Sequence, residues 1–216
     1  NHSLSFDGVD DYVDVSYTSG QIGSEISISA WVNLSSNSNG GHIIFNGCCG
    51  TDATWYWGMM LEYTQLGGGI QPKIMLHTDQ GINGAGHKPS SGTGIITPNS
   101  GWHHVAMTYA INTLKIYLDG TVVHTETVQG SDVMESNKVN IGGFENADGI
   151  FTGSMDGNID EVAIWNTALS ESEIQSSMST SLSGSENGLV SYWNFNDGEG
   201  STLTDLSGNG NDGIIY

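Results

Sequence analysis

The chain has 216 residues and a formal net charge of −20 at pH 7, with 24 acidic residues against four lysines and no arginine. This balance argues against nucleic-acid binding, which needs clustered Lys or Arg, and also against anionic membranes. The length allows one β-sandwich domain or two small domains, and we expect a single domain over residues 1–216. No apolar stretch predicts membrane insertion, and the first residues lack signal-peptide regions, which favours a mature or excised segment.

Short alternating or apolar runs separated by glycine-rich turns predict β-strands along most of the chain. They lie at residues 12–17, 25–34, 41–47, 55–63, 72–78, 102–110, 113–119, 121–128, 138–144, 158–165 and 188–195. About eleven short strands predict an all-β fold of two packed antiparallel sheets. The sharpest hairpin turn is expected at Asp119 and Gly120, which supply the positive φ angles of a tight primed turn.

One stretch, "NTALSESEIQSSM" at residues 166–178, predicts a short surface helix. Ser170 is the expected N-cap, Glu173 completes a capping box, and Ile174 shares a face with Met178. Residues 66–71 and 81–101 fit neither a strand nor a helix. Loops of this length are commonly binding loops or mobile connections.

Two carboxylates fall in strand register with core-facing side chains. Asp11 shares its face with Val13 and Val15, and Asp160 shares its face with Ile164. An unpaired buried carboxylate is costly, and this chain offers few cationic side chains to neutralise one. A bound calcium ion would do so.

Several segments together resemble the laminin-G-like, concanavalin A-like lectin/glucanase family. They are "LSFDGVDDYVDV", "ISAWVN", "GWHHVAMTY", "IYLDGTVV", "GNIDEVAIWNTALSESEI" and "GLVSYWNFNDGEGSTLTDLSGNGNDG". The resemblance implies a jelly-roll sandwich, an extracellular (secreted or cell-surface) location, and a structural calcium where the "FDG" turn meets the "DEV" strand.

Calcium ligands are carried over from the family residue by residue. The resemblance implies that Asp160 binds through its side chain. The turn formed by Asp7, Gly8, Asp10 and Asp11 would supply carboxylate or carbonyl oxygens, which are the hard ligands that calcium prefers. A solvated acidic turn is the alternative, because Asp and Gly are also ordinary turn residues.

The segment "NGCCGTDATWYWGMM" lies outside the shared motifs and predicts the ligand site. Cys48 and Cys49 are the only cysteines, so the one internal disulfide available joins neighbours, and two reduced thiols are the alternative. A vicinal disulfide and the indoles of Trp55 and Trp57 would offer flat surfaces for a sugar ring. The competing interpretation is an inner strand. Its one face would carry Trp55, Trp57, Met59 and Leu61, and its other face Tyr56, Met60 and Glu62.

Several other aromatic and histidine residues are candidates either for ligand contacts or for the core. Tyr56, His77 and His87 are added as candidate ligand contacts, since such side chains hydrogen-bond sugar hydroxyls. One of His103 and His104 is expected to be a core histidine with its hydrogen bonds satisfied. The tryptophans within family motifs are expected in the core or at its rim, namely Trp31, Trp102, Trp165 and Trp193.

Residues 188–216 depart from the family order, because this motif usually precedes an "LxFDG" segment and here closes the chain. The segment either completes its own sandwich or begins a further repeat. We favour the first interpretation, since the ends of a sandwich domain are commonly adjacent.

These observations predict a calcium-stabilised, non-catalytic module that binds a glycan or polysaccharide and belongs to a larger multidomain protein. A structural or adhesive domain that contacts another protein is the first alternative, and a glycan-cleaving enzyme is the second. Glucanases of related fold carry an acidic triplet of the form ExDxE or ExDxxE. Neither pattern occurs in the chain.

Overall fold

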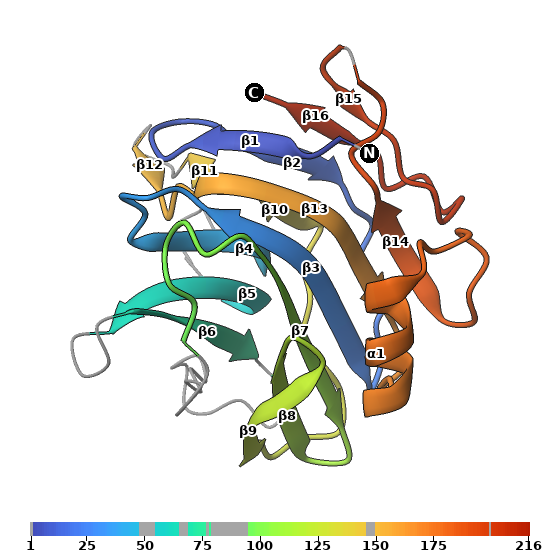
Figure 1. The fold of residues 1–216 in the computed structure, drawn as a ribbon. Coiled ribbons are helices and arrows are strands. Elements are labelled where there is room, and N and C mark those ends of the chain that lie inside the picture. Colours follow the sequence, from blue (N-terminus) through green and yellow to red (C-terminus); the bar gives the residue numbers. More distant parts are fainter. Residues whose placement is uncertain are drawn as a thin grey trace.

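The computed structural model is a sandwich of two antiparallel sheets with one helix on its outer side (Figure 1). It describes residues 2–47, 55–64, 69–76, 78, 95–145, 150–198 and 200–216. This architecture confirms the predicted all-β jelly-roll sandwich with one short surface helix.

The first sheet, called here the β3 sheet, carries the helix. Its order is β1 (Leu4–Asp7), β13 (Asp156–Trp165), β3 (Ile26–Leu34), β7 (Trp102–Ala110), β8 (Thr113–Leu118) and β9 (Thr121–Thr127), with β14 (Leu189–Trp193) also paired to β13. The second, called the β4 sheet, has the order β15 (Thr202–Leu203), β16 (Gly213–Ile215), β2 (Val13–Ser16), β10 (Lys138–Ile141), β4 (Gly40–Gly47), β5 (Trp55–Thr64) and β6 (Gly69–Leu76). A small ribbon pairs β11 (Phe144–Glu145) with β12 (Phe151–Thr152).

The core lies between the two sheets and follows the period of two expected of strands. On β3 the side chains of Ile28 and Val32 are fully buried in it. On β5 the buried row is Trp57, Met59 and Leu61, which confirms the predicted inner face of that strand. Full burial of such side chains contributes about 1.5–3 kcal/mol each.

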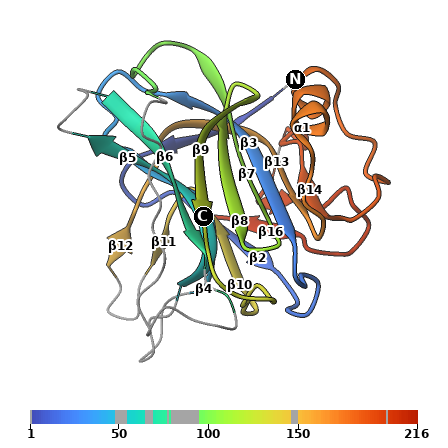
Figure 2. The same cartoon turned by 90° about the horizontal axis from the view of Figure 1, so that it is seen from below.

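Helix α1 (Glu171–Ser179) packs on the face of the β3 sheet that points away from β5 and β6 (Figure 2). The predicted capping box is confirmed: the Glu173 N–H donates to Ser170 Oγ at 3.3 Å, and the Ser170 N–H donates to the Glu173 carboxylate at 2.7 Å. Ile174 is buried against Ala106 and Tyr117. Among the described residues, no helix combines the length and apolar character that crossing a membrane requires.

The two ends of the chain contribute strands to both sheets. β14 pairs with β13, and β16 pairs with β2 through Gly213 opposite Val15. The ring of Tyr216 stacks on Tyr12, with centroids 4.9 Å apart. The sequence does not predict strands β1, β12, β15 and β16, because runs of two to four residues are too short to show a period. The strand predicted at residues 138–144 is divided into β10 and the start of β11.

The tight turn between β8 and β9 forms where the sequence predicts it. Asp119 has φ 49° and Gly120 has φ 74°, as a primed turn requires. The side chain of Asp119 also accepts the N–H of His104 at 2.9 Å, which ties the turn to β7.

Candidate functional site

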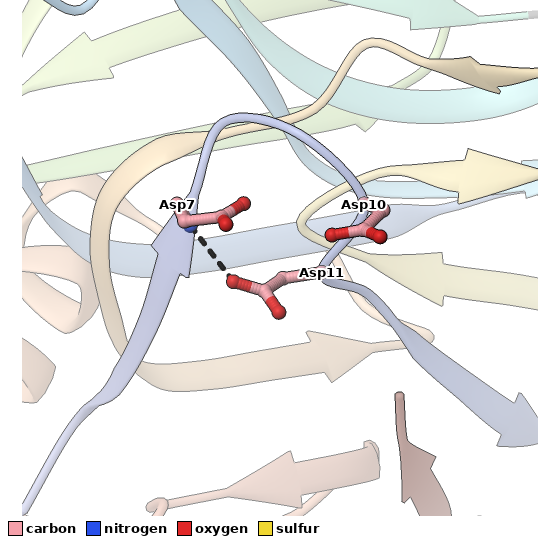
Figure 3. A group of neighbouring side chains, drawn as sticks. All are labelled: Asp7, Asp10 and Asp11. Atoms are coloured by element: carbon pink, nitrogen blue, oxygen red, sulfur yellow. Dashed lines mark hydrogen bonds between the residues drawn. The ribbon is translucent and has the colours of Figure 1, made fainter.

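The turn between β1 and β2 gathers the carboxylates of Asp7, Asp10 and Asp11 (Figure 3). One oxygen from each residue lies within 4.8 Å of the other two. Calcium binds oxygens at 2.3–2.6 Å, so two ligands of one ion are at most about 5 Å apart. The spacing and the oxygen donors therefore fit a calcium ion, and the structure brings these three predicted ligands together.

Local hydrogen bonds and a glycine set the shape of this turn. The Asp7 N–H donates to Asp11 Oδ2 at 2.8 Å, and the Val9 N–H donates to Asp7 Oδ1 at 2.8 Å. Gly8 has φ 81°, and a Cβ at this position would lie 2.9 Å from the Cβ of Asp156. A glycine is required at position 8, because a side chain would be both strained and crowded there.

Asp160 lies apart from the acidic turn, which corrects the predicted ligand set. Asp7 pairs with Asp156 across β1 and β13, and Asp160 is four residues further along the strand, or about 13 Å at the usual rise. It is buried at 5% exposure and accepts the Glu161 N–H at 2.8 Å. The predicted face is wrong, because the bulge between Asp160 and Ala163 shifts the alternation and leaves Asp160 opposite Trp31, on the side away from Ile164. Asp11 is partly exposed at the rim rather than facing the core.

The predicted ligand residues of β5 separate into core and undescribed positions. Trp57 is 0% exposed and lies edge-on to Tyr17 in the core. Its indole offers no accessible face, which corrects its prediction as a ligand contact and supports the core alternative. Trp55 opens β5 opposite Gly47, and its side chain lies outside the described residues. Tyr56 is partly buried and packs against the core.

Four further predicted contact residues lie outside the part of the chain that the structure describes. They are Cys48, Cys49, His77 and His87. Most of the loop at residues 81–101 lies outside it as well. The proposed disulfide and the sugar contacts of these side chains therefore stay predictions.

The tryptophans of the family motifs divide into two groups. Trp165 and Trp193 are buried, as predicted. Trp102 is 42% exposed and Trp31 is partly exposed, so both belong to the outer surface of the β3 sheet. Alternation along a strand predicts which face of the sheet a residue occupies. It does not predict how much of that face a helix covers, so the exposure of Trp31 and Trp102 could not be predicted from the sequence.

His104 is the buried histidine of the predicted pair, but it lies opposite Trp31 on the outer face of the β3 sheet rather than in the core between the sheets, and its hydrogen bonding also differs from the prediction. It is 2% exposed, and its Nδ1 has no hydrogen-bond partner among the described residues. Burial lowers the pKa of His104 to about 4, against a smaller opposing effect of Asp119. The ring is therefore neutral at pH 7.

Comparisons with known structures find the same fold in several solved proteins of low sequence identity. A proposed carbohydrate-binding protein from Bacteroides ovatus ATCC 8483 is 17% identical with a TM-score of 0.76; the match covers 99% of this chain and 57% of that protein. The CBM40 of the Ruminococcus gnavus IT-sialidase, bound to α2,3-sialyllactose, is 13% identical with a TM-score of 0.63, covering 82% of this chain and 96% of that one. Domain 4 of the extracellular arabinanase AbnA from Geobacillus stearothermophilus, in complex with arabinotriose, is 18% identical with a TM-score of 0.54, covering 81% and 75%.

These low identities establish a shared fold, and the chain spans little more than half of the Bacteroides protein. A comparison with curated proteins finds no match. The family model described as the concanavalin A-like lectin/glucanases superfamily matches residues 7–175, which is most of the chain. The resemblance seen in the sequence motifs is thereby confirmed, and the chain belongs to the concanavalin A-like lectin/glucanases superfamily.

Proposed function

We propose that the chain is a calcium-stabilised module that binds glycans without cleaving them, as part of a larger extracellular protein. The observation that carries the proposal is the acidic turn, where three carboxylate oxygens lie within the spacing of calcium ligands. Its setting is a sandwich fold whose solved relatives include modules in complex with sialyllactose and arabinotriose.

Calcium would act here as a structural ion. Three like charges within 4.8 Å repel one another, and a divalent cation between them offsets that repulsion. Asp7 and Asp11 each use one oxygen in the hydrogen bonds of the turn, which leaves the second oxygen to face an ion. The carbonyl of Gly8 and the carboxylate of Asp10 would complete the protein's share of the ligands.

The predicted ligand site on the loop before β5 remains part of this proposal. Trp55 would stack on a sugar ring beside a rigid ring formed by Cys48 and Cys49, with His77 and His87 as hydrogen-bond donors. Oxidation of the cysteine pair is checked by mass spectrometry, since a disulfide removes two hydrogens from the chain. Iodoacetamide labelling of the native protein at both cysteines would exclude the disulfide.

Within the described part of the chain, Ser100, His103 and Asp119 resemble a serine hydrolase relay, but their hydrogen bonding supports a non-catalytic role. Ser100 Oγ lies 2.8 Å from His103 Nε2, and His103 Nδ1 lies 2.9 Å from Asp119 Oδ2. The Ser100 hydroxyl, however, donates its hydrogen to the carbonyl of Thr97. A nucleophilic serine must give that proton to the histidine, so the hydrogen bonding favours a structural link between the turn and β7.

A glycan array probed in calcium and in EGTA tests the proposed function. We expect binding to a restricted set of glycans in calcium, and weaker binding after chelation. Absence of glycan binding by the folded, calcium-loaded protein would refute the proposal and favour an adhesive domain. Release of shorter sugars from a bound glycan would instead identify an enzyme.

A further inference from the structure

The outer face of the β3 sheet carries a groove beside the end of α1, distinct from the acidic turn and from β5. The groove has a volume of about 310 Å³. Its sheet wall is formed by Trp31, Trp102, Asp160 and Glu161, and its other wall by residues 177–181 at the end of the helix and just beyond it.

Strand register brings these side chains to one face. Asp160 on β13 lies opposite Trp31 on β3, which in turn lies opposite His104 on β7. Residues directly opposite one another in a sheet point to the same side. Two positions further along the same face, Asn33 lies opposite Trp102, and this part of the sheet lies beyond the last turn of α1.

The two indoles form the apolar part of the groove. Trp102 is 42% exposed, and Trp31 is partly exposed. The ring of Trp31 meets that of buried His104 on the neighbouring strand at 66°, with centroids 5.3 Å apart, so it packs against a buried partner on the same face. Aromatic faces held in this way stack on the apolar face of a sugar ring and lose little conformational entropy on binding.

Two carboxylates are held at the same wall. Asp160 is 5% exposed and accepts the N–H of Glu161 at 2.8 Å. Glu161 has φ 52°, a left-handed conformation uncommon for glutamate, at a bulge that re-aims the strand between Asp160 and Ala163. Its carboxylate accepts a hydrogen bond from the Tyr192 hydroxyl, which fixes the direction of the side chain.

The end of α1 adds to the negative character of the groove. The helix ends at Ser179, and its last turn carries no basic residue. Unpaired carbonyl groups at a helix C-terminus carry partial negative charge and attract cations. Within the described part of the chain no lysine lines the groove, and the sequence contains no arginine.

We propose that this groove is a second glycan-binding site, selective for a sugar residue that carries a protonated amino group. The proposal rests on the proposed function, since it assumes that glycans are the ligands of the module. The sugar ring stacks on Trp102, while the ammonium group lies between the two carboxylates and the helix end, close to an indole face that also attracts cations. An acidic sugar would meet the like charges of Asp160 and Glu161.

Calorimetry on the calcium-loaded chain at pH 6 and low salt tests this selectivity. The probes are a glucosamine trimer, an N-acetylglucosamine trimer, α2,3-sialyllactose and lysine methylamide. We expect the glucosamine trimer to bind about tenfold more tightly than the acetylated trimer, because only the amine can form an ion pair with the carboxylates. Sialyllactose and lysine methylamide are expected to bind far more weakly, because the first is anionic and the second lacks a ring.

Two variants assign the binding to the groove. Trp102→Ala should weaken glucosamine-trimer binding about tenfold, and Glu161→Gln should abolish the preference for the amine over the acetylated sugar. The matched controls are Tyr63→Ala, which removes a half-exposed aromatic residue on β5, and Glu171→Gln, which removes an exposed carboxylate at the other end of α1. Both controls should bind as the wild type does.

The outcomes separate this site from the module's general function. Equal affinity for the amino and acetylated trimers, or wild-type binding by Trp102→Ala and Glu161→Gln, would overturn the groove proposal even if the array shows other glycans bound. Lysine methylamide binding as tightly as the amino trimer would overturn it too, because the groove would then be a cation site rather than a sugar site. An array without any bound glycan would count against the proposed function itself.

Discussion

Tyr17 and Trp57 meet edge to face inside the sandwich, with ring centroids 6.1 Å apart and planes at 82°. Trp57 is fully buried, and the Tyr17 hydroxyl donates to Glu135 at 2.5 Å. Trp57→Ala should therefore lower the free energy of unfolding by about 3–5 kcal/mol, the usual cost of emptying an aromatic core position. Urea denaturation measures the change.

The control for this prediction is an aromatic residue at the surface of the same strand. Tyr63 is 50% exposed, so Tyr63→Ala should change the unfolding free energy by less than about 1 kcal/mol. If Trp57→Ala lowered the unfolding free energy no more than Tyr63→Ala does, and glycan binding fell, Trp57 would be a ligand contact.

Calcium should stabilise the fold through the acidic turn. At about a hundred times its dissociation constant, an ion that binds only the folded state adds about 2.7 kcal/mol to the unfolding free energy. Asp10→Asn should remove most of this gain, because it takes one charge from a group whose oxygens lie within 4.8 Å. Thermal melts in calcium and in EGTA compare the two proteins.

The register of β1 with β13 supplies the control for the calcium experiment. Asp7 pairs with Asp156, which leaves Asp160 well along the strand from the turn. Asp160→Asn should accordingly keep the full calcium-dependent shift in melting temperature. If the calcium-dependent shift in melting temperature were lost in Asp160→Asn and kept in Asp10→Asn, the ion would lie at Asp160 and not at the acidic turn.

The features that the sequence predicts well are local in the chain. Ser170 and Glu173 are three residues apart, so their capping box depends on little beyond the helix itself. Asp7, Asp10 and Asp11 lie within one short turn, and their proximity follows from the turn. Side-chain alternation likewise identified the inner face of β5, because a strand has a fixed period of two.

Features set by distant parts of the chain escaped the sequence analysis. The distance of Asp160 from the acidic turn depends on the register between β1 and β13, which lie about 150 residues apart and which no local pattern specifies. The exposure of Trp102 depends on where α1 ends over the sheet. The bulge at Glu161 is visible only once β13 is paired with β3.

Residues 188–216 are expected to be essential for folding. All five residues of β14 are buried, and Gly213 of β16 pairs with Val15 in the β4 sheet. A chain that ends at Asn187 should lose its cooperative thermal transition, because the β3 sheet loses β14, the β4 sheet loses β15 and β16, and the core loses Trp193.

Removal of Tyr216 alone is the matched control for this truncation. Its side chain is 57% exposed, so the melt should stay close to that of the full chain despite the loss of its stacking on Tyr12. A sharp melt and protease resistance in the chain ending at Asn187 would show instead that residues 1–187 fold by themselves.

The buried ring of His104 should make the fold sensitive to mild acid. Its pKa is about 4 in the folded state, lowered chiefly by burial, while an unfolded chain has an ordinary imidazole pKa of 6.5. As pH falls below 6.5, the unfolded state therefore binds a proton that the folded state rejects. The contribution of His104 to stability is complete above pH 6.5 and is lost progressively down to about pH 4.

The expected size of this effect at pH 5 is about 2 kcal/mol relative to pH 7.5, from the difference between the two pKa values. Urea denaturation across this pH range gives the slope of the unfolding free energy against pH. The carboxylates are the same in all variants and contribute equally to each slope. His104→Phe keeps an aromatic ring beside Trp31 and cannot titrate, so its slope should be shallower than that of the wild type. His2→Gln, which removes an exposed histidine, is the matched control. Equal slopes for wild type and His104→Phe would mean that the imidazole is protonated inside the folded protein.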